Sequence, residues 1–350
     1  MSALFYVGAY SEALVAAELD TERGEMREVY RADGAHRATV LALNQARTHL
    51  YAGHEYFPGS GGVSAWKLDD AGCPRQLNYL PAHGEGPCHV ALVDGGQYLM
   101  SAGYYDGKLM LFPIAADGAL APACSEVQLH GSGPVLHDPP RAMGQNQARA
   151  HFVLPMAGTP YILCADYGSD KVRLFVIENG APKEHSALLL PPGSGPQHLC
   201  MHGAHVYAVC ELNSTMAALR FDMAAGVLEA MQIRSTLPEG YTGFSEAVDV
   251  CIPRGGRHLY TLNRGQDSIA VFPLLASGAP LGAPSHVAEG VKLPRSLAAD
   301  PSGQFLLVCN EHADEVALYS LCPEDGLPVF TGVVLPAEKP AGICFYEGDL

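Results

Sequence analysis

Short hydrophobic runs that end in a cluster of polar residues or glycine recur along the whole chain. The runs are LFYVGAY from Leu4, HLYAGHE from His49, QYLMSAGYYDG from Gln97, YILCADYGSD from Tyr161, VYAVCELNS from Val206, HLYTLNRGQDS from His258 and FLLVCNEHADE from Phe305. A second short run, such as KLMLFPI or EVALYSL, follows most of them, and a turn with Asp or Gly often comes next. Runs of this length between turn residues predict β-strands, and long patterns with the helical period are scarce.

The starts of these runs lie about 45 to 64 residues apart, close to the period of a propeller blade. A four-stranded sheet cannot bury both faces alone, whereas sheets packed radially around an axis cover one another. We therefore predict an all-β fold, a seven-bladed propeller that occupies residues 1–350 as one domain. The last segment, PAGICFYEGDL, has the pattern of the first strand of a blade that continues with LFYVGAY. Residues 2–33 are thus expected to complete the blade begun by residues 338–350 and to close the ring.

A second recurring pattern precedes the strands expected nearest the axis. It is Gly-Pro-Cys-His at residues 86–89, Gly-Pro-Gln-His at 195–198 and Leu-Pro-Arg-Ser at 293–296. In propellers such turns lead into the innermost strand, where their side chains can face the mouth of the central channel. The alternative is a proline-fixed turn whose His or Arg packs locally. For the set of three we favour the channel-facing interpretation.

Residues 124–149 interrupt the period of the repeat. Long segments without secondary structure are uncommon in compact folds, and they are often functional. This insertion is expected either to line the channel or to pass over the surface, and the sequence leaves both possibilities open.

Composition and charge limit the kinds of molecule that the protein is expected to bind. The formal net charge is −16 and no Lys/Arg-rich run occurs, so nucleic acid is not an expected partner, and any anion site must be made locally by a few arginines. No apolar run has membrane-spanning length, and the N-terminus lacks the pattern of a secretory signal. The ten cysteines stand singly, often inside strand-like runs, which is typical of a reducing cytoplasm.

With the repeat in place, the chain resembles the lactonase family of seven-bladed propellers, which includes bacterial propeller-type 6-phosphogluconolactonases and fungal carboxymuconate cyclases. The segments that carry the resemblance are HLYAGHE, GPCHVALVDGGQYLMSAGYYDG, QNQARAHF, ADYGSDKVRLF, GPQHLCMHGAHVYAVCELNST, RHLYTLNRGQDSIAVF and PRSLAADPSGQFLLVCNE. The resemblance implies a hydrolase that opens a sugar-derived lactone at the channel mouth, as a 6-phosphogluconolactonase does. It implies no cofactor and no metal, and its partner is a small-molecule lactone or sugar acid. A ring closed within one chain can act as a monomer.

Three positions depart from the pattern of that family. Its Pro-His-Ala-His stretch is Ala-Arg-Ala-His at residues 148–151, so that Arg149 replaces a histidine and His151 is kept. Its Gly-Pro-Arg-His turn carries Gln197 in place of arginine, and a usual Glu corresponds to Asp249, with Glu246 close by. The substrate is accordingly left open among a sugar phosphate, an unphosphorylated sugar acid lactone and a dicarboxylate.

Lactone hydrolysis needs a base for water, a donor for the developing oxyanion, and contacts that place the ring. His151, His198 or Glu211 can serve as the base, which is worth about 10²–10⁴ in rate. Arg264 is the best candidate for the oxyanion or a substrate carboxylate, because its planar guanidinium is always charged. We therefore assign catalysis to His151, Glu211 and Arg264. The residues expected to bind substrate are His89, Arg149, Gln197, His198, Asp249 and Arg295.

Three other interpretations compete with a metal-free lactonase. A cycloisomerase that closes or opens a muconolactone would use the same base and arginine. A non-catalytic interaction propeller would instead show aromatic and Arg anchors over a wide face, but Trp66 is the one tryptophan. A calcium-dependent lactonase would need clustered oxygen ligands, and Glu55, Glu211, Glu246 and Asp249 are the candidates.

Overall fold

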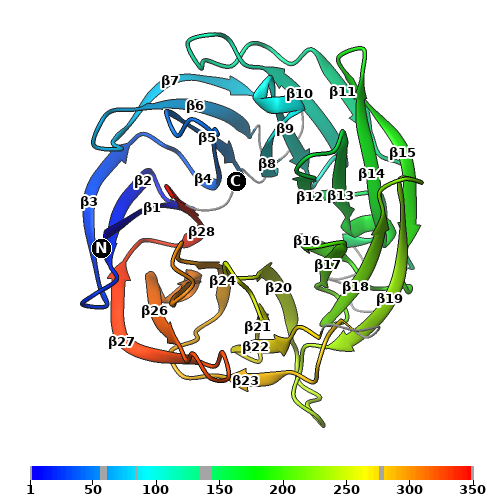
Figure 1. Ribbon diagram of the computed structural model, residues 1–350. Coiled ribbons are helices and arrows are strands. Elements are labelled where there is room, and N and C mark those ends of the chain that lie inside the picture. Colours follow the sequence, from blue (N-terminus) through cyan, green and yellow to red (C-terminus); the bar gives the residue numbers. More distant parts are fainter. Residues whose placement is uncertain (1, 56–60, 83–85, 135–143, 276–279, 348–350) are drawn as a thin grey trace.

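The computed structural model describes residues 2–55, 61–82, 86–134, 144–275 and 280–347. These residues form seven four-stranded antiparallel sheets arranged around a central axis, as Figure 1 shows. From the axis outward the sheets are β28 (Pro340–Phe345), β1 (Ser2–Ala9), β2 (Ala13–Asp20) and β3 (Glu25–Asp33); β4 (Ala38–Leu43), β5 (His49–His54), β6 (Gly62–Leu68) and β7 (Pro74–Pro81); β8 (Pro87–Val93), β9 (Tyr98–Gly103), β10 (Lys108–Pro113) and β11 (Ser125–Gln128); β12 (Ala150–Pro155), β13 (Tyr161–Asp166), β14 (Lys171–Glu178) and β15 (Ala181–Leu189); β16 (Pro196–His202), β17 (His205–Cys210), β18 (Thr215–Asp222) and β19 (Val227–Ser235); β20 (Glu246–Cys251), β21 (His258–Arg264), β22 (Ser268–Pro273) and β23 (Ser285–Val287); and β24 (Pro294–Ala299), β25 (Phe305–Asn310), β26 (Glu315–Leu321) and β27 (Pro328–Pro336).

The ring closes as the sequence predicts. The C-terminal strand β28 pairs antiparallel with the N-terminal strand β1, with Phe5 opposite Phe345. In Figure 1 the red β28 lies beside the blue β1 at the inner edge of one blade. The two ends of the chain therefore complete a single sheet, and the predicted seven-bladed propeller is confirmed.

The hydrophobic runs of the sequence are the second strands of the blades. A second strand packs against neighbouring blades on both faces, so nearly all its side chains are buried, as in β17 and β25. The outer strands are different, because β3 and β19 are half-exposed and alternate between apolar and polar residues. Apolar burial is the main stabilising term, and it is concentrated between the blades.

Tyrosines of three second strands bind the next blade. The hydroxyl of Tyr6 donates to the carbonyl of Gly72, that of Tyr51 to Gly118 and that of Tyr260 to Gly326, over 2.7, 3.1 and 2.6 Å. These hydroxyls are buried, so each bond satisfies a polar group that would otherwise be costly. The repeated contact fixes neighbouring blades to one another.

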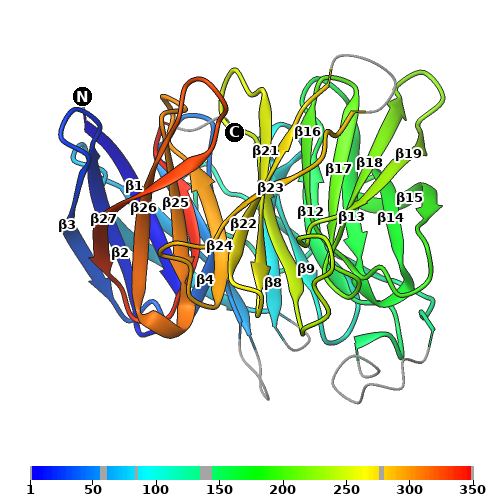
Figure 2. The same cartoon turned by 90° about the horizontal axis from the view of Figure 1, so that it is seen from below.

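One face of the propeller collects the chain segments that matter for function. Because the innermost and second strands of each blade are antiparallel, the innermost strands begin where the second strands end. We call this side of the disc the entry face; Figure 2 shows the strands running between the two faces. The predicted turns 86–89, 195–198 and 293–296 lead into β8, β16 and β24, which are innermost strands.

Every innermost strand carries a β-bulge, which lies at the second residue in six blades and at the fourth residue in β20. The pairing with the second strand skips one residue in each of the seven blades, and the skipped residues are Thr39, Cys88, His151, Gln197, Asp249, Arg295 and Ala341. A bulge bends the strand and re-aims a side chain, and bulges are common beside active sites. Six blades thus present one redirected side chain near the entry face, and β20 presents Asp249 further along the strand.

The segment 124–149 is partly regular. Residues Ser125–Gln128 form β11, the outer strand of the third sheet, where the sequence predicted an insertion without structure. The four residues SEVQ are too few and too polar to stand out as a strand. After residues 135–143, which lie outside the described ranges, the chain returns to the entry face, and Gln145 and Arg149 are buried there. In the described ranges no helix has the length and apolar character needed to cross a membrane.

Candidate functional site

Two sets of side chains meet at the entry face near the axis. One set consists of the bulged residues of the innermost strands. The other lies at the ends of the second strands and comprises Tyr10, Glu55, Tyr104, Tyr167, Glu211, Arg264 and Glu311. Because both sets recur at fixed positions of the repeat, residues far apart in the sequence become neighbours.

Glu211 is the most buried carboxylate of this second set, with 8% of its surface exposed. Its Oε1 accepts a hydrogen bond from the Tyr167 hydroxyl at 3.2 Å, and its Oε2 accepts one from Nε2 of Gln197 at 2.6 Å. Burial raises the pKa of Glu211, and the nearby charge of Glu246 raises it further, although Arg264 and the Tyr167 hydrogen bond oppose the shift. A carboxylate with a raised pKa is suited to proton transfer near neutral pH.

Arg264 ends β21 and forms an ion pair with Glu246, the first residue of β20. Its Nε and Nη2 both donate to Oε2 of Glu246, over 3.0 and 2.6 Å. The pair is partly open to solvent, with side-chain exposures of 23% and 18%. Arg264 therefore bonds Glu246 rather than Glu211, while its charge still lowers the pKa of Glu211.

His151 is the bulged residue of β12 and is 5% exposed. Its ring lies 5.6 Å from Tyr104, 6.1 Å from Tyr167 and 5.5 Å from His198, measured between centroids. Burial holds the pKa of His151 well below its usual range, and the charges of His198 and Arg295 act in the same direction. Nδ1 of this neutral imidazole is buried and has no hydrogen-bond partner among the described residues.

Asp249 lies beneath Glu211, Arg264 and His151 and connects three blades through hydrogen bonds. Its carboxylate accepts hydrogen bonds from Nδ1 of His198 at 2.8 Å, from the Ser296 hydroxyl at 2.6 Å and from the backbone N–H of Leu297 at 2.9 Å. Burial alone would raise the pKa of Asp249, but the charge and hydrogen bond of His198 lower it. Asp249 and His198 are consequently engaged with each other.

His89 lies one residue beyond the bulge of β8. Its ring stacks on Phe152 with the centroids 3.7 Å apart, and Phe152 in turn contacts His198 at 4.5 Å. Its Nδ1 accepts the backbone N–H of Val153 at 3.3 Å. Burial holds the pKa of His89 well below its usual range. His89, Phe152 and His198 form an aromatic wall across three adjacent innermost strands.

Arg149 reaches the entry face from the end of the segment 124–149. Its guanidinium lies over the Tyr104 ring, 4.9 Å from the centroid, and Nη1 donates to the Tyr104 carbonyl at 3.3 Å. Nη2 donates to Oδ1 of Asn146 at 3.0 Å, and its backbone N–H is held by Asp166 at 2.9 Å. The arginine that departs from the family pattern is therefore firmly oriented.

Arg295 is the bulged residue of β24. Its Nη2 donates to the Tyr10 hydroxyl at 3.2 Å, and that hydroxyl donates to Oε2 of Glu55 at 2.7 Å. The phenol of Tyr10 and the carboxylates of Glu55 and Glu311 raise the pKa of Arg295 despite its burial. Arg295 thus remains charged beside the axis.

All nine residues predicted for the site lie at the entry face or on the innermost strands directly beneath it. Tyr10 and Tyr167 were not predicted for the site, although both follow a second strand at the position that Glu211 occupies in its blade. That shared position in the repeat was the signal for them. Among the described residues, no three His, Cys, Asp or Glu side chains gather closely enough to hold a metal ion.

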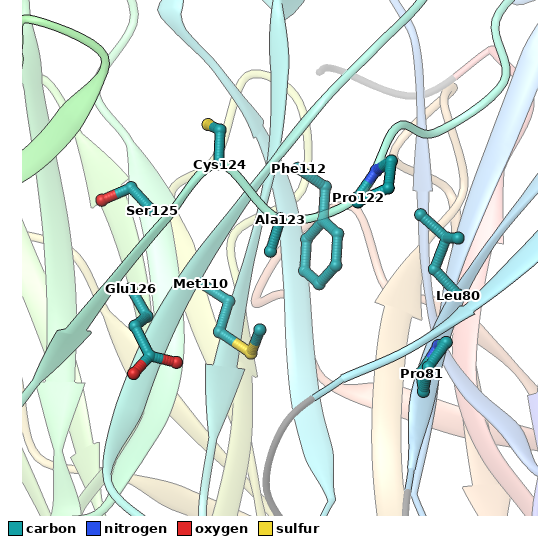
Figure 3. A pocket seen from close by; sticks show the side chains of 9 residues that line it. All are labelled: Leu80, Pro81, Met110, Phe112, Pro122, Ala123, Cys124, Ser125 and Glu126. Carbon is teal, nitrogen blue, oxygen red and sulfur yellow. The ribbon is translucent and has the colours of Figure 1, made fainter.

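A cavity of about 500 Å³ lies elsewhere, between the outer strands of two neighbouring blades. Figure 3 shows Met110 and Phe112 of β10 facing this cavity, with Leu80 and Pro81 of β7 on the opposite side. None of the nine predicted residues lines it. The chemistry predicted for the chain and this peripheral groove are separate features.

Comparisons with known proteins agree with this architecture. The family model described as "Lactonase, 7-bladed beta-propeller" matches residues 4–345. The chain is 32% identical over 328 residues to a Bacillus subtilis (strain 168) protein named 6-phosphogluconolactonase, with 92% of each chain covered. A solved structure from Lactobacillus plantarum matches with a TM-score of 0.88 at 28% identity, covering 99% of each chain. The periplasmic gluconolactonase of Pseudomonas aeruginosa has a TM-score of 0.88 at 23% identity over 99% of each chain, which shows a common fold.

Proposed function

Because the chain belongs to the lactonase family of seven-bladed β-propellers, we propose that it is a lactonase that hydrolyses 6-phosphogluconolactone at the centre of its entry face. The observation that carries the proposal is Glu211, a buried carboxylate with a raised pKa that lies near two arginines, Arg264 and Arg295. The relative in Bacillus subtilis supports this choice of substrate.

In the proposed reaction Glu211 takes a proton from a water molecule as its oxygen attacks the lactone carbonyl carbon. Two of the roughly four acceptor positions of the carboxylate are used by Tyr167 and Gln197, so others are open to water. Arg264 stabilises the oxyanion of the tetrahedral intermediate. The bond between the carbonyl carbon and the ring oxygen then breaks, and the proton on Glu211 passes to that oxygen, which gives the open-chain hydroxy acid.

The remaining residues are proposed to place the substrate. Arg149 and Arg295 supply positive charge for the phosphate in a chain whose formal net charge is −16. His151, whose ring lies beside those of Tyr104, Tyr167 and His198, contacts the sugar in this proposal. His89, His198 and Asp249 form the wall and floor beneath the sugar. The bond from His198 to Asp249 and the bond from the Asp249 backbone N–H to Gln197 keep that surface rigid.

The test is a pH-indicator assay on purified protein with 6-phosphoglucono-δ-lactone and glucono-δ-lactone, with and without EDTA. We expect acid release well above the spontaneous rate, a preference for the phosphorylated lactone, and loss of that release in Glu211→Gln. An equal rate of acid release with and without protein would contradict the proposal. Muconolactones would then test the cycloisomerase alternative. Calcium dependence would appear as EDTA sensitivity.

We further propose a cytoplasmic monomer. The ten cysteines are all free, and six of them are at least partly exposed, which suits a reducing compartment. The ring is closed within one chain, so no partner is needed to complete a blade. Fractionation of cells and size-exclusion chromatography with light scattering test the two statements.

A further inference from the structure

Gln197 stands where the family pattern has arginine, and its amide is held at both ends. Its carbonyl Oε1 accepts the backbone N–H of Asp249 at 3.2 Å, and its Nε2 donates to Oε2 of Glu211 at 2.6 Å. Gln197 is the bulged residue of β16 and is 1% exposed. Because a backbone N–H can only donate, it fixes which end of the amide faces Glu211.

We infer that Gln197 is a positioning residue, which holds the Glu211 carboxylate in its ionised, proton-accepting form rather than binding substrate. This inference rests on the proposed function for the role of Glu211 in catalysis. The hydrogen bond from an amide donor favours a carboxylate over the neutral acid. Its geometry is set by the backbone of the adjacent blade, so the bond is in place before any substrate arrives.

The donor end of the Gln197 amide faces Glu211. The other groups around this carboxylate include both donors or cations that favour its ionised form and a like charge that opposes it. Tyr167 donates to Glu211 from β13's end, and the cations of Arg264 and Arg295 approach from the next two blades. Glu246 is the opposing like charge, and the phenol of Tyr104 also lies within electrostatic range. Gln197 and the Tyr167 hydroxyl are the two neutral donors, and Gln197 bonds the oxygen of Glu211 that Tyr167 leaves unbonded.

Asp249 secures the other end of the amide. It is itself a bulged residue with a left-handed backbone, φ = 51°, and its carboxylate is held by His198, Ser296 and Leu297. A backbone fixed in this way cannot rotate its N–H away from Gln197 without breaking those bonds. The chain of contacts from β24 through Asp249 and Gln197 to Glu211 therefore acts as one rigid support.

The experiment compares Gln197→Glu and Gln197→Met with wild type. Glu at 197 keeps the shape but replaces the donor by an acceptor, and Met removes both hydrogen bonds without adding charge. The matched control is Gln97→Glu, because Nε2 of Gln97 donates to Asp94 at 3.4 Å on the exposed surface. The readouts are the pH profile of kcat/KM, the separate values of kcat and KM, and the titration of Glu211 by NMR of protein labelled with ¹³C at the Glu carboxyls.

We expect kcat to fall at least tenfold at pH 7 in Gln197→Glu, with KM within about twofold of wild type. In this variant Glu211 and the carboxylate introduced at position 197 titrate as a pair. The acid limb of the pH profile and the upper midpoint of that pair should both move up by about one pH unit or more. Gln197→Met should move the Glu211 midpoint in the same direction by less, and Gln97→Glu should move nothing. A resonance lost in Glu211→Gln identifies Glu211.

Two results would overturn the inference. One is an unchanged Glu211 midpoint in both variants of Gln197. The other is a raised KM with unchanged kcat and pH profile, which would make Gln197 a substrate contact. The titration needs no substrate, so a protein without lactonase activity whose Glu211 midpoint still shifts would refute the proposed function and leave the role of Gln197 standing.

Discussion

Replacing Glu211 by Gln should abolish hydrolysis and, at neutral pH, stabilise the fold. Burial raises the pKa of Glu211 above its ordinary 4.5 in the folded protein. When the pH is above the raised pKa, the folded protein carries a buried carboxylate at Glu211, which unfolding would return to water. The ionisation of Glu211 therefore lowers the stability of the folded state. Below about pH 4.5 the side chain is protonated in both states and the cost is gone. Gln resembles the neutral acid, so its advantage exists at neutral pH and disappears as the pH falls.

The magnitude follows from the linkage relation. Each pH unit between the folded and unfolded pKa contributes about 1.4 kcal/mol. For 350 residues the unfolding entropy is about 0.7 kcal/mol/K, so one unit corresponds to a rise in Tm of about 2 °C. The hydrogen bonds survive, because the Gln oxygen can accept from Gln197 while its amide donates to the Tyr167 oxygen.

The assay is thermal unfolding of Glu211→Gln and wild type at several pH values between 4.5 and 8.5, beside activity at pH 7. The control is Glu239→Gln, because Glu239 is an exposed glutamate. We expect a Tm difference that grows with pH for position 211 and stays near zero for position 239. A lower Tm for Glu211→Gln at neutral pH, or a difference that does not vary with pH, would refute the account of Glu211 as a destabilising buried base.

Three further predictions concern other contacts. Arg264→Met should lower kcat/KM by about 10²–10³ and change Tm little, because its ion pair is partly exposed; a collapse in Tm would mark the pair as structural. Arg149→Lys keeps the charge but loses the planar group over Tyr104, so KM for the phosphorylated lactone should rise about tenfold, and an unchanged KM would remove Arg149 from the site. Tyr260→Phe leaves the Gly326 carbonyl without its donor and should cost about 1–3 kcal/mol in urea unfolding with activity intact; an unchanged midpoint would contradict this.

The blade repeat could be predicted because second strands are buried on both faces. A strand such as β17 must be apolar along its whole length, so VYAVC stands out from its surroundings. The outer strand β19 alternates and is half-exposed, and β11 has only four residues, so neither is distinct from a loop in the sequence. Ring closure was predictable for the same reason, since the C-terminal segment has the pattern of an innermost strand without a following partner.

The site could be predicted only in part, because its contacts join distant blades. The turns before β16 and β24 marked Gln197 and Arg295, but the bond from Arg295 to Tyr10 spans 285 positions. The sequence also did not show which carboxylate each arginine bonds. Glu211 and Glu246 are both candidates for Arg264 by charge, and the strand register, which sets Glu246 opposite Arg264, decides between them. Sequence shows which residues can take part, whereas register decides which of them bond.

The distribution of the bulges explains how the site can change while the fold is kept. Three consecutive blades present small side chains at the bulge, namely Ala341, Thr39 and Cys88, and the other four present His151, Gln197, Asp249 and Arg295. None of the seven bulge residues belongs to the hydrophobic clusters between the blades. Replacing arginine by glutamine at 197 therefore alters the support of Glu211 without a cost in core packing. Substrate preference in this chain should accordingly follow His151, Arg295 and Arg149, and not the hydrophobic repeat that builds the ring.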